Sequence, residues 1–200
     1  MPARSPRTEL PLFPLSTVLF PGARLDLRVF EPRYLDLVRE CTRNDKGFGV
    51  CLILAGDEAG MPAVPAAVGT LARIVDFHHD ADGLLGIVVE GGPRFRVRRT
   101  RARADGQLRG SVDWWPEERY VQVPVELALL QTIGERLVDI MAPQFKDAAR
   151  ASYDDARWLG FRLAELMPLT NDERQRLLEM VDPLQRLAEL RDILPRFQKA

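Results

Sequence analysis

Two histidines and two carboxylates form the most concentrated group of metal-ligating side chains in the sequence. His78 and His79 are followed by Asp80 and Asp82. Neighbouring residues of a strand point to opposite faces, and no third histidine or nearby cysteine completes a ligand set. We therefore interpret this segment as the solvated tip of a hairpin, with a metal site as the alternative. We expect no metal and no other cofactor.

Nucleophilic catalysis would require a serine or cysteine beside one of the two histidines, and no motif places such a pair together. The Gly47-x-Gly49 pair lacks the third glycine of a dinucleotide-binding fingerprint and precedes an expected strand. The sequence contains no G-x-x-x-x-G-K-[ST] phosphate loop. We therefore expect no catalytic residue. A hydrolase with an Asp or Glu site stays open, because clustering in space is invisible in a sequence.

Seven arginines crowd the stretch from residue 94 to residue 109. Alternation along an expected strand puts Arg94, Arg96 and Arg98 on one face, opposite Phe95 and Val97. Such a face suits a phosphate backbone, so an RNA-binding module that uses these three arginines is the alternative function. Residues 1–118 hold 16 basic and 16 acidic side chains, however. We therefore interpret the arginines as a solvated strand face paired with acidic neighbours.

Composition indicates an ordinary globular chain. The 200 residues are 46% apolar and 28% charged. The 28 Lys and Arg nearly cancel the 29 Asp and Glu, which excludes the overall positive field that drives non-specific binding to nucleic acid or anionic membranes. Cys41 and Cys51 are too few for a disulfide framework, and we expect both to be reduced core residues of a cytoplasmic protein. No apolar run approaches the length of a membrane span.

The front of the chain, from Leu10 to about Asp113, has the short apolar runs of β structure. In Leu25–Val29 apolar and charged residues alternate, which predicts a strand with one wet face. Phe48–Leu54 is continuously apolar and predicts a strand in the middle of a sheet. Between them, Pro32 and an apolar stripe that ends at Cys41 predict a helix.

A hairpin is the clearest local prediction of this region. Its strands are Val68–Phe77 and Leu84–Glu90, and Asp82-Gly83 suits the positive backbone angles of the connection. We expect a turn at Gly91-Gly92-Pro93 and a further strand over Arg94–Arg99.

After Trp114 and Trp115 the apolar period becomes helical. One helix is expected up to Pro143, and its core stripe comprises Leu127, Leu130, Ile133, Leu137 and Met141. A second helix is expected over Tyr153–Met167. A capping box of Thr170 and Glu173, and an Asp182-Pro183 start, predict helices near 171–180 and 183–194. The prediction is an α+β chain with a β-rich domain over 1–118 and a helical domain over 119–200.

Three separated segments carry a resemblance to a known family. They are ELPLFPLSTVLFPGARLDLRVFEPRYLDLV, then VGTLARIVDF with GIVVEGGPRFRV, and finally LTNDERQRLLEMVDPLQRLAEL. In this order, over about residues 9 to 194, they resemble the N-terminal, substrate-recognition domain of Lon proteases. The resemblance implies a PUA-like β-barrel or sheet followed by a helical bundle. It also implies recognition of unfolded or damaged proteins and no catalytic residue.

The sequence departs from a complete Lon protease, so we expect a free-standing form of the domain. The Lon peptidase uses a Ser and Lys pair, and none of the lysines present, Lys46, Lys146 and Lys199, stands in such a motif. The resemblance therefore implies a non-enzymatic protein-binding module. Its expected partners are client polypeptides or a partner ATPase or protease, with no membrane. The sequence does not identify the protein-binding residues, although an exposed edge strand would allow pairing with extended client segments.

Overall fold

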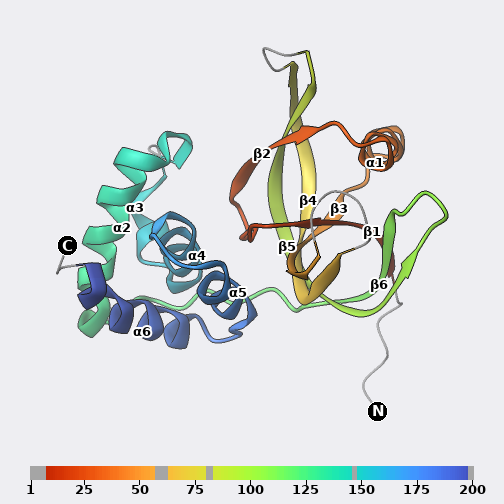
Figure 1. The fold of residues 1–200 in the computed structure, drawn as a ribbon. Helices are drawn as coiled ribbons and strands as arrows, with labels where there is room; N and C mark the ends of the chain where they lie inside the picture. Colours follow the sequence, from red (N-terminus) through yellow and green to blue (C-terminus); the bar gives the residue numbers. More distant parts are fainter. Residues whose placement is uncertain (1–7, 57–62, 80–82, 146–147, 198–200) are drawn as a thin grey trace. The chain divides into compact units, whose positions relative to one another are not determined.

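The computed structural model describes residues 8–56, 63–79, 83–145 and 148–197. These residues divide after Pro116 into two compact units, here called the strand unit and the helical unit (Figure 1). Strands come first and helices second, which confirms the predicted α+β class. None of the helices in this part of the chain is both long and apolar enough to cross a lipid bilayer.

The strand unit is built on one mixed sheet of six strands. They are β1 (Thr8–Leu15), β2 (Arg24–Val29), β3 (Phe48–Ala55), β4 (Val64–His79), β5 (Leu85–Ala102) and β6 (Leu108–Trp114). The order is β2-β5-β4-β3-β1-β6, and β5 also pairs with β6. The sheet therefore closes on itself through five strands, while β2 lies at the edge beside β5. β1 and β3 are parallel, and the other pairs are antiparallel.

The interior of this closed sheet is filled by apolar side chains from four strands and by Cys51. The cluster comprises Leu10, Leu12, Cys51, Leu71, Phe95, Leu108 and Val112, and Val97 and Trp114 pack against it. Gly49 lies beside this cluster, and a Cβ there would meet the Phe95 ring at 2.5 Å. β3 is buried from Phe48 to Leu52, which confirms its predicted place in the middle of the sheet.

The turn that the sequence predicts at Gly91-Gly92-Pro93 is wrong. β5 continues through these residues and pairs with β4 on both sides of them, with a shift of register. Gly91 instead allows the chain before β2 to approach. Its N–H donates to the Ala23 carbonyl at 2.9 Å, and the Gly22 N–H donates to the Gly91 carbonyl at 2.6 Å. A Cβ on Gly91 would overlap the carbonyl oxygen of Phe20.

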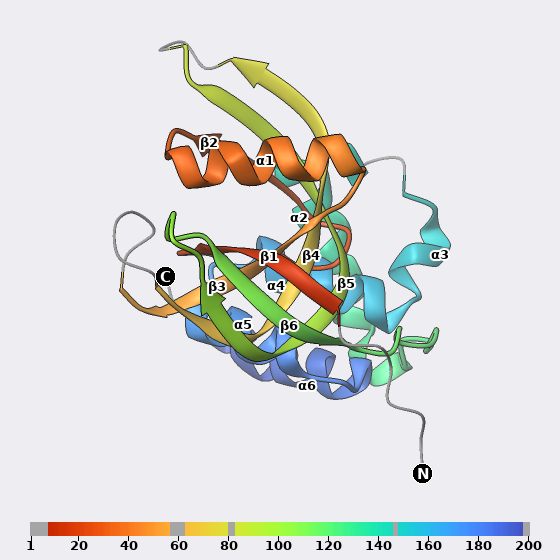
Figure 2. The same cartoon turned by 90° about the vertical axis from the view of Figure 1, so that its right-hand side faces the viewer.

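The predicted hairpin is confirmed by the antiparallel pairing of β4 with β5, which runs as far as His79 and Leu85. Gly83 has the expected positive φ of 80°. Asp82, the other residue of the predicted turn, lies outside the described residues. Figures 1 and 2 both show this hairpin extending away from β3.

Helix α1 (Pro32–Asn44) begins with proline in its first turn, as predicted, and packs on the strands. The Tyr34 ring stacks on Phe13 of β1 with centroids 3.9 Å apart. Leu37, Val38 and Cys41 are buried with it, which confirms the predicted stripe. The helix ends at Asp45, whose φ of 50° is left-handed.

The helical unit consists of α-helices and short 3-10 turns. The α-helices are α2 (Ala128–Met141), α3 (Arg150–Tyr153), α4 (Ala156–Leu166), α5 (Asn171–Glu179) and α6 (Pro183–Ile193). The 3-10 turns are η1 (Val125–Leu127), η2 (Pro143–Phe145) and η3 (Leu194–Phe197). Both predicted caps are confirmed. Thr170 and Glu173 form the capping box of α5, and the Asp182 side chain accepts from the Leu184 N–H at the start of α6.

Two helix predictions need correction. The helix expected from Tyr153 begins instead at Ala156, because the Asp155 side chain accepts from the Arg157 N–H and caps it there. In α2 the buried residues are Leu130, Gly134 and Val138, whereas Met141 of the predicted stripe is exposed. A Cβ on Gly134 would meet Leu159 of α4 at 2.5 Å, so the helix turns its smallest residue toward its neighbour.

Candidate functional site

The three arginines proposed for RNA binding do not share one solvated face. Arg94 is only 5% exposed, and its guanidinium lies 4.7 Å from the centre of the Trp115 ring. The Trp115 backbone N–H also donates to the Arg94 carbonyl at 3.0 Å. Arg94 is therefore held against the last residues of the strand unit instead of facing solvent.

Arg96 and Arg98 are exposed and have different neighbours. The Arg96 guanidinium lies 5.5 Å from the Trp115 ring centre, on the same ring as Arg94. Arg98 donates to the Asp113 carboxylate at 2.7 Å. The register of β5 and β6 shifts between Val97 and Arg99, which interrupts the simple alternation expected along this strand. RNA binding by Arg94, Arg96 and Arg98 stays a prediction.

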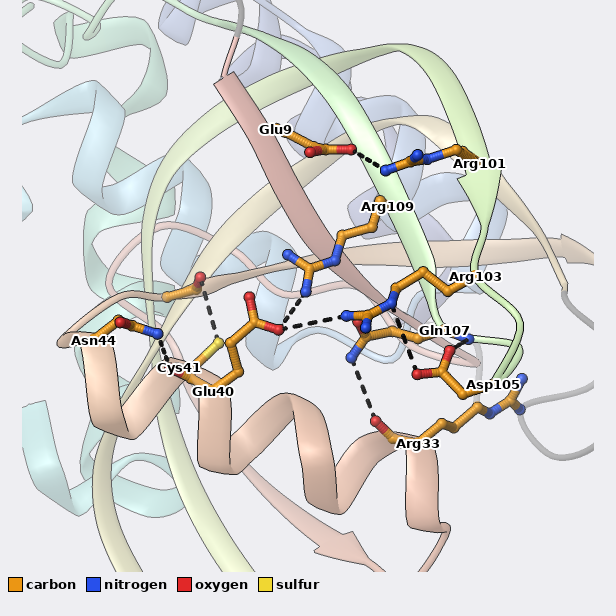
Figure 3. Close-up of polar contacts among 11 residues, drawn as sticks. Glu9, Arg33, Glu40, Cys41, Asn44, Arg101, Arg103, Asp105, Gln107 and Arg109 are labelled. Atoms are coloured by element: carbon orange, nitrogen blue, oxygen red, sulfur yellow. Dashed lines mark hydrogen bonds and ion pairs between the residues drawn. The ribbon is translucent and has the colours of Figure 1, made fainter.

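Carboxylates pair with three further arginines of the stretch, Arg101, Arg103 and Arg109, which Figure 3 shows. Arg101 donates to Glu9 at 2.9 Å. Arg103 lies 3.8 Å from both Glu40 and Asp105, and Arg109 also pairs with Glu40. The predicted pairing with acidic neighbours is thus confirmed for these residues and for Arg98.

The same close-up shows how α1 is tied to the hairpin between β5 and β6 (Figure 3). The Gln107 side-chain amide donates to the Arg33 carbonyl at 3.3 Å, and the Arg33 guanidinium donates to the Gly106 carbonyl at 3.3 Å. Arg33 also pairs with Glu31 at 2.9 Å. These contacts fix the helix in place and present no reactive group.

The thiols are poorly suited to nucleophilic chemistry. Both cysteines are buried and free. Burial raises the pKa of Cys41 to about 11, with a further increase from Glu40 that Arg109 opposes. Burial alone raises the pKa of Cys51 to about 12. Since the thiolate is the reactive form, neither side chain is activated near neutral pH.

The His78 side chain reaches across β5. Its Nε2 lies 3.4 Å from an Asp26 carboxylate oxygen on β2, two strands away. Asp80 and Asp82, the other members of the alternative metal site, lie outside the described residues. Within the described ranges, no three His, Cys, Asp or Glu side chains gather in a way that could hold a metal ion.

One half-buried carboxyl group of the helical unit, that of Glu165, bears on the alternative of a hydrolase. Burial raises the pKa of Glu165, and the guanidiniums of Arg162 and Arg174 oppose this. Arg162 is buried and lies 2.7 Å from Glu165. This carboxylate therefore belongs to an interior ion pair, which has a structural role.

Exposed apolar side chains are the remaining candidates for recognition, and sequence reasoning identified none of them. In the strand unit they are Phe30, Leu54, Val64, Val75 and Phe77, and in the helical unit Tyr120, Val125, Leu129, Ile140, Met141 and Val181. Val75 and Phe77 lie two residues apart on β4, and Val75 stands at the register shift between Ile74 and Asp76. The apolar sequence alone does not distinguish such residues from core residues, because burial depends on the neighbouring strand.

Comparison with known proteins supplies a family. Residues 9–196 match the model of the ATP-dependent protease La (LON) substrate-binding domain. Lon protease 2 of Myxococcus xanthus is 29% identical over 196 residues, which cover 94% of this chain and 23% of that protein. Lon protease of Escherichia coli (strain K12) is 29% identical over 201 residues, which cover 94% of this chain and 25% of that protein. The chain thus spans about a quarter of the length of these curated relatives.

A solved structure agrees in fold and sequence. The Lon N-terminal domain protein from Xanthomonas campestris is 45% identical, with a TM-score of 0.79, and the match covers 93% of this chain and 98% of that one. The N-terminal domain of Mycobacterium avium complex Lon protease shares the fold at 20% identity, with a TM-score of 0.64. That match covers 92% of this chain and 97% of that one.

Proposed function

This chain belongs to the family of Lon substrate-binding domains, and from that membership we propose that it binds unfolded segments of client polypeptides without catalysing a reaction. The match over residues 9–196 to a substrate-binding family carries the proposal. The exposed apolar side chains support it, since unfolded clients differ from folded proteins mainly in the apolar segments they expose.

A purely binding role fits the chemistry of the described residues. The two thiols have raised pKa values, and four of the seven arginines between residues 94 and 109 are paired with carboxylates. The sequence holds no phosphate loop and no lysine in a peptidase motif. We propose that a partner ATPase or protease acts on what this chain binds. Two free, buried cysteines support a cytoplasmic location, where thiols stay reduced.

Fluorescence anisotropy tests the proposal directly. The probe is a labelled protein that has been reduced and carboxymethylated, so that it cannot refold. We expect saturable binding by the purified chain with Kd on the order of micromolar. The unlabelled unfolded probe should compete, whereas the same protein in its native form should not.

Two outcomes would overturn the proposal. One is the absence of binding at high micromolar concentrations of the chain. The other is recovery of RNA but not of unfolded protein, with binding that falls steeply as salt is added, because that dependence is typical of contacts to phosphates.

A further inference from the structure

The two strands of the β3–β4 pair end at different places. β3 begins at Phe48, which pairs with Ala72 of β4. β4 then continues for seven residues, Arg73–His79, and within the described residues these pair with β5 alone. One edge of this segment, here called the free edge of β4, therefore has no strand beside it in the described structure. Figures 1 and 2 show the corresponding hairpin extending beyond β3.

An unpaired strand edge selects its partner by backbone chemistry. Its N–H and C=O groups alternate along the edge at the spacing of another extended chain. Within Arg73–His79 the Phe77 N–H already donates to the Asp76 carboxylate at 2.8 Å, a local contact that an added strand could replace. A folded surface or a helix does not offer such a row, because its own backbone groups are already bonded. The complementary ligand is an extended polypeptide, which adds a strand and gains main-chain hydrogen bonds.

Apolar side chains accompany the free edge. Val75 and Phe77 are each 47% exposed. Phe77 pairs with Ile87 of β5, which is fully buried, so Phe77 continues the core-facing side of the sheet into solvent. An added strand would cover this ring with its own inward side chains. The ligand is therefore extended and carries apolar residues at alternate positions.

The end of the free edge at Arg73 carries an excess of positive charge. A Cβ on Gly47 would overlap the carbonyl oxygen of Ala72, so the turn after α1 lies against β4 where the free edge begins. The last turn of α1 carries Arg43, and the turn after it carries Asp45 and Lys46. All three are exposed, and so is Arg73 on β4. Glu90, which lies opposite Arg73 on β5, is paired with Arg24. The remaining three cations and one carboxylate leave a net charge of two positive units there. An acidic residue at the corresponding end of the ligand complements it.

We propose that the free edge of β4, Arg73–His79, binds one extended segment of a client as an added strand, with apolar side chains on Val75 and Phe77 and an acidic residue near Arg73. This inference rests on the proposed function and assigns it a site and a mode of binding. The register of β4 and β5 shifts between Ile74 and Asp76, and such a bulge twists an edge. The twist opposes long, flat stacking of copies and favours a short segment.

The edge of the sheet formed by β2 is less suitable for binding an added strand. Among the strands that the structure describes, β2 pairs only with β5, but its inward residues Leu27 and Val29 are already buried. An added strand beside β2 would therefore meet little uncovered apolar surface.

The probe is a labelled peptide with the sequence acetyl-Glu-Glu-Val-Ser-Val-Ser-Val-Ser-amide. We expect it to bind the full chain, and we expect Phe77→Lys and Val75→Lys to weaken binding at least tenfold. Ala67→Lys is the matched control, because Ala67 is exposed on the same strand and lies six residues before the free edge. It should leave binding unchanged.

Backbone pairing is tested separately from apolar contact. Methylating the peptide nitrogens of the valines in one version, and of the serines in another, removes alternate donors. We expect one version to lose binding at least tenfold and the other to retain it, because alternate amides of a strand face opposite edges. Equal binding of both versions would overturn the added strand.

Hydrogen exchange on the unmodified protein gives a result even if a variant fails to fold. Binding of the peptide should slow exchange at amides within Arg73–His79, and unchanged exchange there would overturn the site. If the protein binds the unfolded carboxymethylated probe but Val75→Lys and Phe77→Lys have no effect, the site is wrong and the proposed function stands. If the protein binds neither the unfolded carboxymethylated probe nor the peptide, both the proposed function and the proposed site are wrong.

Discussion

Arg186 of α6 and Glu118, at the start of the helical unit, form a buried two-pronged ion pair. The guanidinium, which is 0% exposed, donates to the two carboxylate oxygens at 3.1 and 2.5 Å. It also donates to the carbonyls of Leu177 and Met180 and lies 3.9 Å from the Phe161 ring centre. A single side chain thus joins α4, α5 and α6 to the segment that precedes them.

We predict that Glu118→Ala destabilises the helical unit by about 3–5 kcal/mol, because it leaves the Arg186 charge buried without its carboxylate. Urea unfolding followed by circular dichroism measures the change. Replacement of both residues, with Glu118→Leu and Arg186→Met, should cost less than the single change. A double variant that is as unstable as Glu118→Ala would contradict this explanation.

Gly91→Ala should destabilise the strand unit by about 1–3 kcal/mol, because the new Cβ overlaps the carbonyl of Phe20 and must displace the chain before β2. Gly92→Ala is the matched control. A Cβ there meets its nearest atom, the carbonyl oxygen of Leu71, at an ordinary 3.5 Å. Thermal unfolding compares the two variants, and an equal loss for both would refute the close-approach role of Gly91.

Because of the capping box of α5, the free energy of unfolding should depend on pH in the acidic range. Hydrogen bonds from Arg196 and from the Thr170 backbone lower the pKa of Glu173 from 4.5 to about 2. A carboxyl group with a lowered pKa in the folded state contributes stability above its unfolded pKa, and loses it as pH falls through the folded value. Between pH 4.5 and 2 the free energy of unfolding should therefore fall less in Glu173→Gln than in the unchanged protein. Parallel loss in both would show that other carboxylates dominate.

Charge reversal separates the two functions considered for the arginine stretch. Arg96→Glu combined with Arg98→Glu should leave binding of the unfolded probe within about twofold, since neither residue adjoins the free edge of β4 as its strand partner. Gel-shift and anisotropy assays with single-stranded RNA are run on the same samples. RNA binding that is present at low salt and absent in the variant would establish the alternative, whereas loss of polypeptide binding would place the client site on this face.

Local signals in the sequence were sufficient for much of the fold. The resemblance to the Lon family is confirmed over residues 9–196. The α1 stripe, the β4–β5 hairpin, and the caps at Thr170 and Asp182 are all present. Each depends on residues within a few positions of one another, where backbone preference and side-chain spacing act directly.

Tertiary structure decided the features that concern binding. The apolar pattern of β4 does not show that β3 stops beside Ala72, and this end point leaves Phe77 exposed. The charged pattern of β5 does not show that Trp115 covers Arg94. The glycines at 91 and 92 have the composition of a turn. A segment about seventy residues earlier in the chain nevertheless approaches so closely that a strand residue at 91 must be glycine. Side-chain type and spacing specify an element and its faces, whereas the exposure of each face depends on segments distant in sequence that the closed sheet brings beside it.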